Sequence, residues 1–274
     1  MVWRLRLVRR SRAFRHGHDS RGRALTPPEE SDESRIQSIA DAIVSARQSA
    51  RLLDASSLDI WPDEAYQVQD RVHHELWADS PTVGFKLGYT SQVMREVMGI
   101  EEPNHGPLTQ SMVVTSGTLV SGLLQPKVEP ELAVFLDAQG RVERTMASLE
   151  VVDSIWQDYQ FTWAHNTADG SSAAFAVLGD TMPEGCSPDS VDITLTSSDG
   201  SSSSASGNAS GLNLPESLMW LANHSDLPRG LRAGDVILTG GLAKPLDLHA
   251  GGWIEATFGV GDWTTTVRVE RGAD

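Results

Sequence analysis

The amino-acid sequence predicts an α+β protein in which helices come first and strands follow. Apolar residues recur at helical spacings of three and four over residues 34–77. From residue 111 onward the chain consists mostly of short β-branched runs separated by turn residues. We therefore expect a helical or αβ N-terminal part at 34–110 and a β-rich catalytic core at 111–274. A chain of 274 residues can bury a sizeable core, so residues 34–274 are expected to form one compact unit.

Capping and turn residues delimit the elements of the N-terminal part. Helices are predicted from residue 34, within residues 61–77 after a proline start, and at residues 91–99 between Ser91 and Gly99. A strand is predicted at residues 82–90, and EEPNHGPL (residues 101–108) is predicted to be a turn-rich loop. The apolar face of the first helix is formed by Ile36, Ile39, Ala40 and Ile43.

Most of the second half reads as strands. Two helices interrupt them, one predicted around residues 147–158 and one in LPESLMWLANHS (214–225). The serine-rich residues 197–211 suggest either a linker or a polar hairpin, and the alternation of VDITLTS with the turn signal Asp199-Gly200 favours the hairpin. The predicted strands are residues 111–120, 128–136, 175–179, 191–197, 234–241, 253–260 and 264–270.

Charge divides the chain into an arginine-rich arm and an acidic body. Residues 1–24 hold eight arginines and one acid, which leaves 14 basic and 36 acidic residues elsewhere. We expect residues 1–33 to be a disordered arm or an upstream translation start, with targeting and a nucleic-acid tail as alternatives. The acidic body argues against nucleic-acid binding. The single cysteine, Cys186, indicates a reducing cytoplasm, and no apolar run is long enough to span a membrane.

The segment KVEPELAVFL (127–136) places two carboxylates at the start of an apolar strand. Glu129 and Glu131 are two residues apart, so a strand would place them on one face at roughly 6–7 Å. Pro130 cannot donate to a sheet ladder, which predicts an edge or a bulge. The pair is either a solvated edge or a site for Mg²⁺ or Mn²⁺, and a metal would require a third carboxylate, such as Glu150, Asp153 or Asp169.

Lys86 lies in the short apolar strand GFKLG, between two glycines. It is either a lysine whose ammonium reaches solvent at the end of the strand, or a buried group that holds a substrate carboxylate or moves a proton. Surface or capping roles are expected for His73, His74, His224 and His249, whereas His105 and His165 remain candidates for a site. No nucleophile elbow, P-loop or HExxH motif is present.

Together these segments resemble the 2-keto-4-pentenoate hydratase and 4-oxalocrotonate decarboxylase group of the fumarylacetoacetate hydrolase superfamily. The resemblance covers about residues 34–270. It rests on the order and spacing of GFKLGYTS, GIEEPNHGPL followed by Met112, VEPELAVFL, SLEVVDS, TADGSSAAFAVLG, LPESLMWLAN and LRAGDVILTGGL. It implies a mixed β-roll or sandwich core with a small helical N-terminal part, usually assembled as a homo-oligomer.

The resemblance also implies a site. The metal, Mg²⁺ or Mn²⁺, would be bound by Glu129, Glu131 and Glu150, and Lys86 and Asp169 would be catalytic. The substrate, a 2-oxo or 2-hydroxy-dienoic acid, would chelate the metal. Substrate contacts would come from Leu87, His105, Gly170, Thr239 and Gly241.

Three positions depart from the pattern of the group. Gly170 stands where the group has asparagine, and Gly241 and Ala243 replace a serine and a threonine. The connection DAQGRVERTMA, which often forms a lid, is short. Fewer polar partners and more room suggest a bulkier or less polar substrate than pentadienoate, or a weakened or redirected reaction.

The sequence therefore predicts a metal-dependent hydratase, a lyase that acts through a dienolate. The alternatives are a decarboxylase of a 2-oxo-enedioate, a carbon–carbon hydrolase or tautomerase, and a non-catalytic scaffold that binds an aldolase or a decarboxylase.

Overall fold

The computed structural model describes residues 17–18, 24–25, 32–185, 188–207 and 211–273. The predicted arm at 1–33 lies mostly outside these residues. Its described parts are two short paired strands, β1 (Gly17–His18) and β2 (Ala24–Leu25), and the first two residues of α1. The expectation of a disordered arm therefore stays a prediction.

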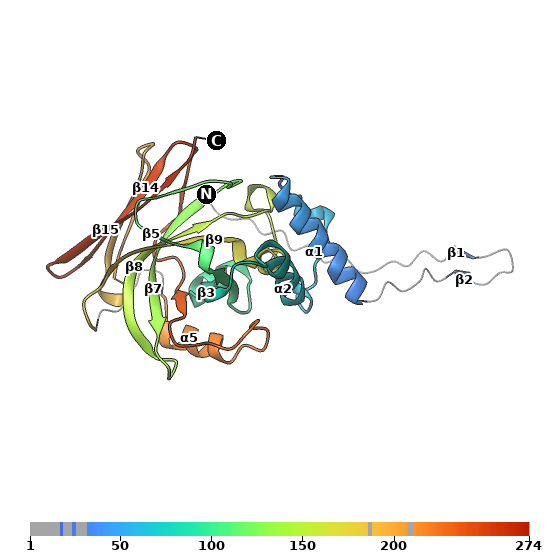
Figure 1. Ribbon diagram of the computed structural model, residues 1–274, viewed down its shortest axis with the longest axis horizontal. Helices are drawn as coiled ribbons and strands as arrows, with labels where there is room; N and C mark the ends of the chain where they lie inside the picture. The colour runs from blue at the N-terminus through green and yellow to red at the C-terminus, as the bar shows by residue number, and fades with distance from the viewer. Residues whose placement is uncertain (1–16, 19–23, 26–31, 186–187, 208–210, 274) are drawn as a thin grey trace.

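The described helices lie at one end of the molecule and along one side of the larger sheet (Figure 1). Those expected at residues 34–43, 61–77, 91–99 and 214–225 are confirmed, and α4 was not predicted. Short 3-10 turns connect other elements, among them η4 (Gly170–Ser172). The α-helices are α1 (Asp32–Gln48), α2 (Ala65–Leu76), α3 (Gln92–Met98), α4 (Trp163–Ala168) and α5 (Leu214–Ala222).

Two sheets contain the strands of the core, and each mixes parallel and antiparallel pairs. The five-stranded sheet has the order β11 (Ser202–Ser206), β10 (Asp192–Ser197), β14 (Trp253–Val260), β15 (Trp263–Arg271), β6 (Thr118–Val120). The eight-stranded sheet has the order β4 (Asn104–Thr109), β3 (Thr82–Gly88), β12 (Val236–Leu238), β7 (Lys127–Leu136), β8 (Val142–Val152), β9 (Ala173–Thr181), β5 (Val113–Thr115), and β13 (Leu246–Asp247) also pairs with β7. The α+β class is confirmed.

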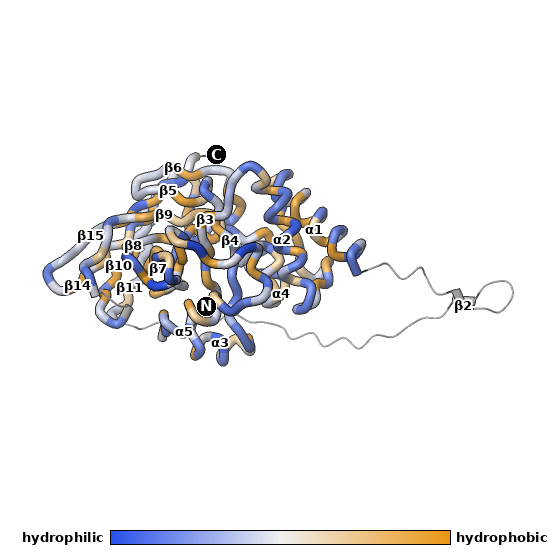
Figure 2. The backbone as a smooth tube through the Cα atoms, turned by 60° about the horizontal axis from the view of Figure 1, so that its bottom comes forward, coloured by the Kyte–Doolittle hydropathy of each residue, from blue (hydrophilic) through white to orange (hydrophobic). Residues whose placement is uncertain are grey.

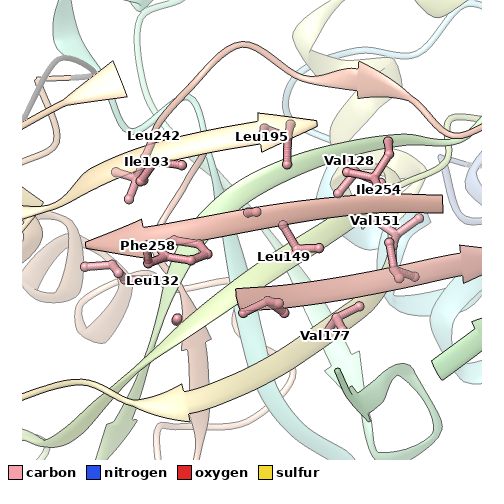
Figure 3. Close-up of a cluster of buried hydrophobic side chains, with 14 of the residues drawn as sticks. Val128, Leu132, Leu149, Val151, Val177, Ile193, Leu195, Leu242, Ile254 and Phe258 are labelled. Carbon is pink, nitrogen blue, oxygen red and sulfur yellow. The ribbon is translucent and has the colours of Figure 1, made fainter. Parts of the chain in front are cut away.

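The two sheets pack against each other through a buried apolar layer (Figure 3). Leu132 and Leu149 enter it from β7 and β8, and Ile254 and Phe258 enter it from β14. Alternation along each strand explains the layer, because residues two apart share a face. The opposite face of β7 and β8 is therefore free to carry the polar residues described below.

A separate apolar cluster attaches α1 and α2 to the larger sheet. Ile39 and Ile43 of α1 and Val68 of α2 share this cluster with Trp156 and Ala164, which follow β8. Hydrophilic and hydrophobic segments alternate along α1 and α2 (Figure 2), as expected for helices with one face on a core. The N-terminal helices therefore contact the segment that leaves the end of β8.

The larger sheet curves so strongly that its edge strand β4 contacts β9, although four strands lie between them in the sheet order. Leu108 of β4 and Ala176 of β9 consequently share one buried cluster with Ala133 of β7. The concave face of this sheet is the one that carries Glu129, Glu131, Lys86 and Glu150, because these residues lie on the same face as that cluster.

Two predicted elements are wrong. Residues 147–152 belong to β8 and not to a helix: Leu149 and Val151 face the intersheet layer while Ser148 and Glu150 face the other way, a period of two. Residues 104–109 form β4 and not a loop, and because β4 is an edge strand it tolerates Pro107. The predicted strand at 111–120 is divided between β5 and β6, which belong to different sheets.

The serine-rich segment forms the hairpin that the alternation favoured. Strands β10 and β11 pair antiparallel from Asp192 opposite Ser206 to Thr196 opposite Ser202. Gly200 in the turn has φ +90°, a conformation that glycine adopts without strain.

Pro130 lies in an interior strand and not at an edge. On one side it is opposite Leu149 of β8. On the other side β12 pairs only with residues 133–135 and β13 only with residues 127–128, so the ladder is interrupted at the proline. The segment between β12 and β13 leaves the sheet there, and its Leu242 N–H donates to the Pro130 carbonyl at 2.9 Å.

Truncating the intersheet layer should destabilise the fold. Leu149 is fully buried between the sheets, so Leu149→Ala is expected to lower the free energy of unfolding by about 3 kcal/mol. Leu119→Ala is the control, because Leu119 is 64% exposed and its truncation should change stability by less than about 0.5 kcal/mol. Denaturant unfolding measures both, and equal losses would contradict this account of the layer.

Candidate metal centre

Three carboxylates from two neighbouring strands meet on the concave face of the larger sheet. Glu129 and Glu131 come from β7, and Glu150 lies directly opposite Glu129 on β8. One oxygen from each carboxylate lies within 4.8 Å of the others. Among the described residues this is the one group of three or more acidic, histidine or cysteine side chains close enough to share an ion. The other candidate third carboxylates, Asp153 and Asp169, are not part of it.

Burial and mutual repulsion disfavour three negative charges at this point. Burial, then Glu150, raises the pKa of Glu129 to about 7, and burial with Glu150 and Glu129 raises the pKa of Glu131 well above its usual range. Directly opposed like charges also weaken the pairing of two strands. The cluster therefore requires positive charge.

Lys86 supplies only part of that charge. Its Nζ lies 3.2 Å from Glu150 Oε1, and both side chains are almost fully buried. Burial alone would lower the pKa of Lys86, but Glu150, Glu129 and Glu131 outweigh it and the net direction is upward. One ammonium offsets one of three carboxylates, so a divalent cation would balance the remainder.

The oxygens of the cluster are available for such a cation. Glu131 Oε2 accepts a hydrogen bond from the Gly240 N–H at 2.9 Å, whereas Glu131 Oε1 and Glu150 Oε2 are buried without a hydrogen-bond partner among the described residues. Buried carboxylate oxygens are costly unless they are hydrogen-bonded or bind a cation. The donor set, with oxygen ligands only, fits a hard divalent ion.

A buried polar network holds the ammonium of Lys86 in place. Lys86 Nζ donates to the Ser171 carbonyl at 2.9 Å and to Ser171 Oγ at 3.2 Å. Ser171 Oγ in turn donates to Asn104 Oδ1 at 2.9 Å, and Asn104 Nδ2 donates to Asn166 and Thr167. Ser171 has φ +56° in η4, a strained conformation that this network stabilises.

Asp169 is buried beside η4, but its carboxylate is occupied. Arg47, at the end of α1, donates to both of its oxygens at 2.8 and 3.0 Å, and the Ile155 N–H donates to Oδ2 at 2.9 Å. Burial raises the pKa of Asp169 to about 6 although Arg47 opposes the shift. Arg47 also binds Asp153. The Asp169 carboxylate is therefore fully engaged by Arg47 and the Ile155 N–H, and its expected catalytic role stays a prediction.

Three of the expected substrate contacts point away from the carboxylates. Leu87 neighbours Lys86 in β3 and faces the opposite side, into an apolar cluster with Leu221 of α5. His105, opposite Leu87 on β4, stacks on Tyr66 at 4.5 Å. Thr239 is buried and its hydroxyl donates to the Leu132 carbonyl at 3.1 Å. Strand alternation therefore separates these side chains from Lys86.

The two predicted glycine contacts lie near the site. A Cβ at Gly241 would be 2.7 Å from Glu129 Oε2, so glycine here lets the backbone pack directly against that carboxylate. Gly170 begins η4 with φ +65°. Its carbonyl oxygen would lie only 2.0 Å from a Cβ at residue 106, so this close packing requires glycine at Gly106. Ala243 is partly exposed and follows Gly241 out of the sheet.

Sequence reasoning missed Arg47, Asn104, Ser171 and the Gly240 N–H. The signal for Ser171 was the pair of serines after Asp169, but Asn104 was assigned to a loop and Arg47 looked like an ordinary last-turn cation. Each acts through contacts between segments that are distant in sequence.

Comparison with known proteins finds hydratases with similar sequences and a decarboxylase with a similar fold, although no protein-family model matches the chain. It is 31% identical over 245 residues to the 2-keto-4-pentenoate hydratase of Paraburkholderia phymatum, covering 81% of this chain and 93% of that protein. It is 30% identical over 241 residues to the 2-hydroxyhexa-2,4-dienoate hydratase of Comamonas testosteroni, covering 80% and 90%. The 4-oxalocrotonate decarboxylase of Pseudomonas putida, solved with magnesium and adipate, has the same fold: the TM-score is 0.76 with 22% identity over 87% of this chain and 98% of that one.

The fold and the relatives define an enzyme of the hydratase type, as the sequence predicted. The chain belongs to the 2-keto-4-pentenoate hydratase family. Among the residues that the structure describes, no helix has the length and apolar character of a membrane span.

Removing one buried charge should stabilise the metal-free protein and abolish its response to metal. Glu131→Gln retains an oxygen for the Gly240 N–H but removes a charge that burial disfavours. We expect Mg²⁺ or Mn²⁺ at about 100 times its Kd to raise the Tm of the wild type by on the order of 5 °C or more, and to leave that of the variant nearly unchanged.

Glu143→Gln is the matched control, since Glu143 is an exposed carboxylate on β8. Differential scanning calorimetry with and without the ion measures the three proteins. An equal metal response in wild type and Glu131→Gln would show that the cluster binds no ion.

Acid should weaken the fold through His105. Burial, followed by the neighbouring His224, lowers its pKa to about 3, whereas the unfolded chain protonates it near pH 6.5. Between these values the unfolded state binds more protons, so stability falls as the pH drops below about 6.5. His105→Phe should recover about 2 kcal/mol at pH 5 relative to pH 7, by denaturant unfolding at each pH. Parallel pH profiles of the two proteins would contradict this.

Proposed function

We propose that the protein is a divalent-metal-dependent hydratase that adds water to a 2-hydroxy-dienoate or its 2-oxo-enoate tautomer. Glu129, Glu131 and Glu150 would bind Mg²⁺ or Mn²⁺, and Lys86 would be catalytic. The observation that carries the proposal is the convergence of these four side chains in a chain that belongs to a hydratase family. A metal bound there would supply a Lewis acid for the carboxylate and C2 oxygen of the substrate.

Lys86 has the position that proton transfer requires. Its ammonium touches Glu150, so a substrate held at the carboxylate cluster would lie within reach of Nζ. Hydration requires a proton at C5 of the dienol as the 2-hydroxyl proton leaves, after which the hydroxyl of water joins C4 and a proton joins C3. Lys86 can donate the first proton or hold the substrate carboxylate, and Ser171 keeps Nζ in one place for either role.

The surrounding residues would keep this chemistry in a fixed and largely dry pocket. Asp169, bound to Arg47, fixes the turn from which Ser171 contacts Lys86. Glu131 and Glu150 are almost fully buried, so solvent reaches the cluster from the side of the partly exposed Glu129.

We extend the proposal to the fold type, the compartment and the assembly of the protein. The curved larger sheet packed on the smaller one would be the roll of the fumarylacetoacetate hydrolase type. The protein would act in the cytoplasm as a homo-oligomer, with an aldolase or a decarboxylase as a candidate partner.

Product analysis with a panel of 2-hydroxy-dienoates tests the activity. We expect the hydrated 4-hydroxy-2-oxo acid, loss of activity on chelation of metal, and recovery with Mg²⁺ or Mn²⁺. Lys86→Met should lower kcat by at least about 100-fold because a positioned proton donor contributes on this scale.

Lys127→Met is the control, because Lys127 is the other lysine near the cluster and pairs with the exposed Asp247. It should retain most of the activity. Release of CO₂ from a 2-oxo-enedioate without hydration would identify the decarboxylase instead, and the absence of both metal binding and turnover would indicate a scaffold.

A further inference from the structure

Tyr89, directly after β3, has a backbone conformation that its side chain does not favour. Its φ is +55°, in the left-handed region that is natural to glycine and strained for an aromatic residue. Its side chain is only partly exposed. Such a conformation persists only where the surrounding contacts impose it, and it is frequent at functional sites.

The residues on either side of Tyr89 are both packed against the candidate metal centre. A Cβ at Gly88 would lie 2.2 Å from Asn104 Oδ1 and 2.8 Å from Ser171 Oγ, and Ser171 binds Lys86. On the other side, Thr90 Oγ1 would be 2.2 Å from a Cβ at Gly240, whose N–H binds Glu131. The backbone of Tyr89 therefore crosses between the lysine and the carboxylates.

Arg95 of α3 holds this crossing in place. Its Nη1 donates to the Tyr89 carbonyl at 2.6 Å and to the Thr90 carbonyl at 3.1 Å. Two hydrogen bonds from a charged donor to adjacent carbonyls stabilise the positive φ of Tyr89, which a residue with a side chain otherwise disfavours. The strain at Tyr89 is thus maintained by contacts made only in the folded chain.

The side chain of Tyr89 lies near Glu129, and both residues are partly exposed. Burial, with a contribution from the nearby Glu129, raises the pKa of Tyr89, so its hydroxyl stays neutral. Glu129 is also the partly exposed member of the cluster, and Gly241 packs against its carboxylate. No hydrogen bond to the phenol oxygen is made by the residues that the structure describes.

We propose that Tyr89 is a specificity-determining residue whose ring contacts the part of the substrate beyond C4, on the side of the cluster where Glu129 is partly exposed. This rests on the proposed function, because the carboxylate end of a 2-oxo acid would then lie at the buried carboxylates and Lys86. The remainder of the substrate would then extend past the partly exposed Glu129, beside the ring of Tyr89. The pocket would therefore favour 2-oxo acids with an extended apolar tail over the five-carbon compound.

Binding of saturated 2-oxo acids tests this without depending on which reaction follows. In the presence of Mg²⁺, the wild type is expected to bind 2-oxooctanoate at least tenfold more tightly than 2-oxopentanoate, measured by isothermal titration calorimetry. Tyr89→Ala should reduce that ratio to below about threefold, whereas Tyr89→Phe, which retains the ring, should keep it. The Mg²⁺-induced rise in Tm should be the same in all three proteins, which shows that the cluster is intact.

An unchanged ratio in Tyr89→Ala, or a lost ratio in Tyr89→Phe, would overturn the assignment to the ring. The expected ratios without hydration of any dienoate would leave the assignment standing and remove only the proposed reaction. Failure of both acids to bind would overturn both proposals.

Discussion

Three buried carboxylates that share one lysine are the constraint on which the rest of the site depends. Glu129 and Glu150 are opposite one another on adjacent strands, an arrangement that weakens a sheet unless positive charge lies between them. Lys86 meets this need only in part. The remaining negative charge is buried in a low-dielectric interior, where it lowers the stability of the fold. A bound cation would remove this cost, so the charge favours cation binding.

The backbone around the carboxylates is adapted to this constraint. Pro130 lacks an N–H, and the ladder beside it is interrupted. The chain after β12 leaves the sheet at this point, next to Glu129 and Glu131. The Gly240 N–H then donates to Glu131. The absence of a side chain at Gly106 lets η4 approach β4, which places Ser171 against Lys86. Pro130 and the glycines thus free backbone groups from regular sheet pairing, and these groups bind Glu131 and Lys86 instead.

The N-terminal helices contribute to the site through one buried ion pair. Arg47 ends α1 and binds both Asp153, after β8, and Asp169, before η4. Because Asp169 holds the turn that carries Ser171, the packing of α1 is connected to the position of the Lys86 ammonium. An isolated β-rich core would lack this support, which agrees with the apolar cluster that α1 and α2 share with Trp156.

The sequence by itself determined the α+β class and most of the helices and strands, because these depend on local periodicity. Its ordered motifs determined the family and predicted the cluster of side chains formed by Glu129, Glu131, Glu150 and Lys86. It misassigned β8 and β4, since SLEVVDS and NHGPLT carry weak local signals and pair only within a completed sheet. Only the tertiary structure decided that Asp169 is bound by Arg47, and that Leu87 and His105 face away from Lys86. The reason is physical: which face a side chain takes, and what it meets there, depends on strand register and on contacts between distant segments.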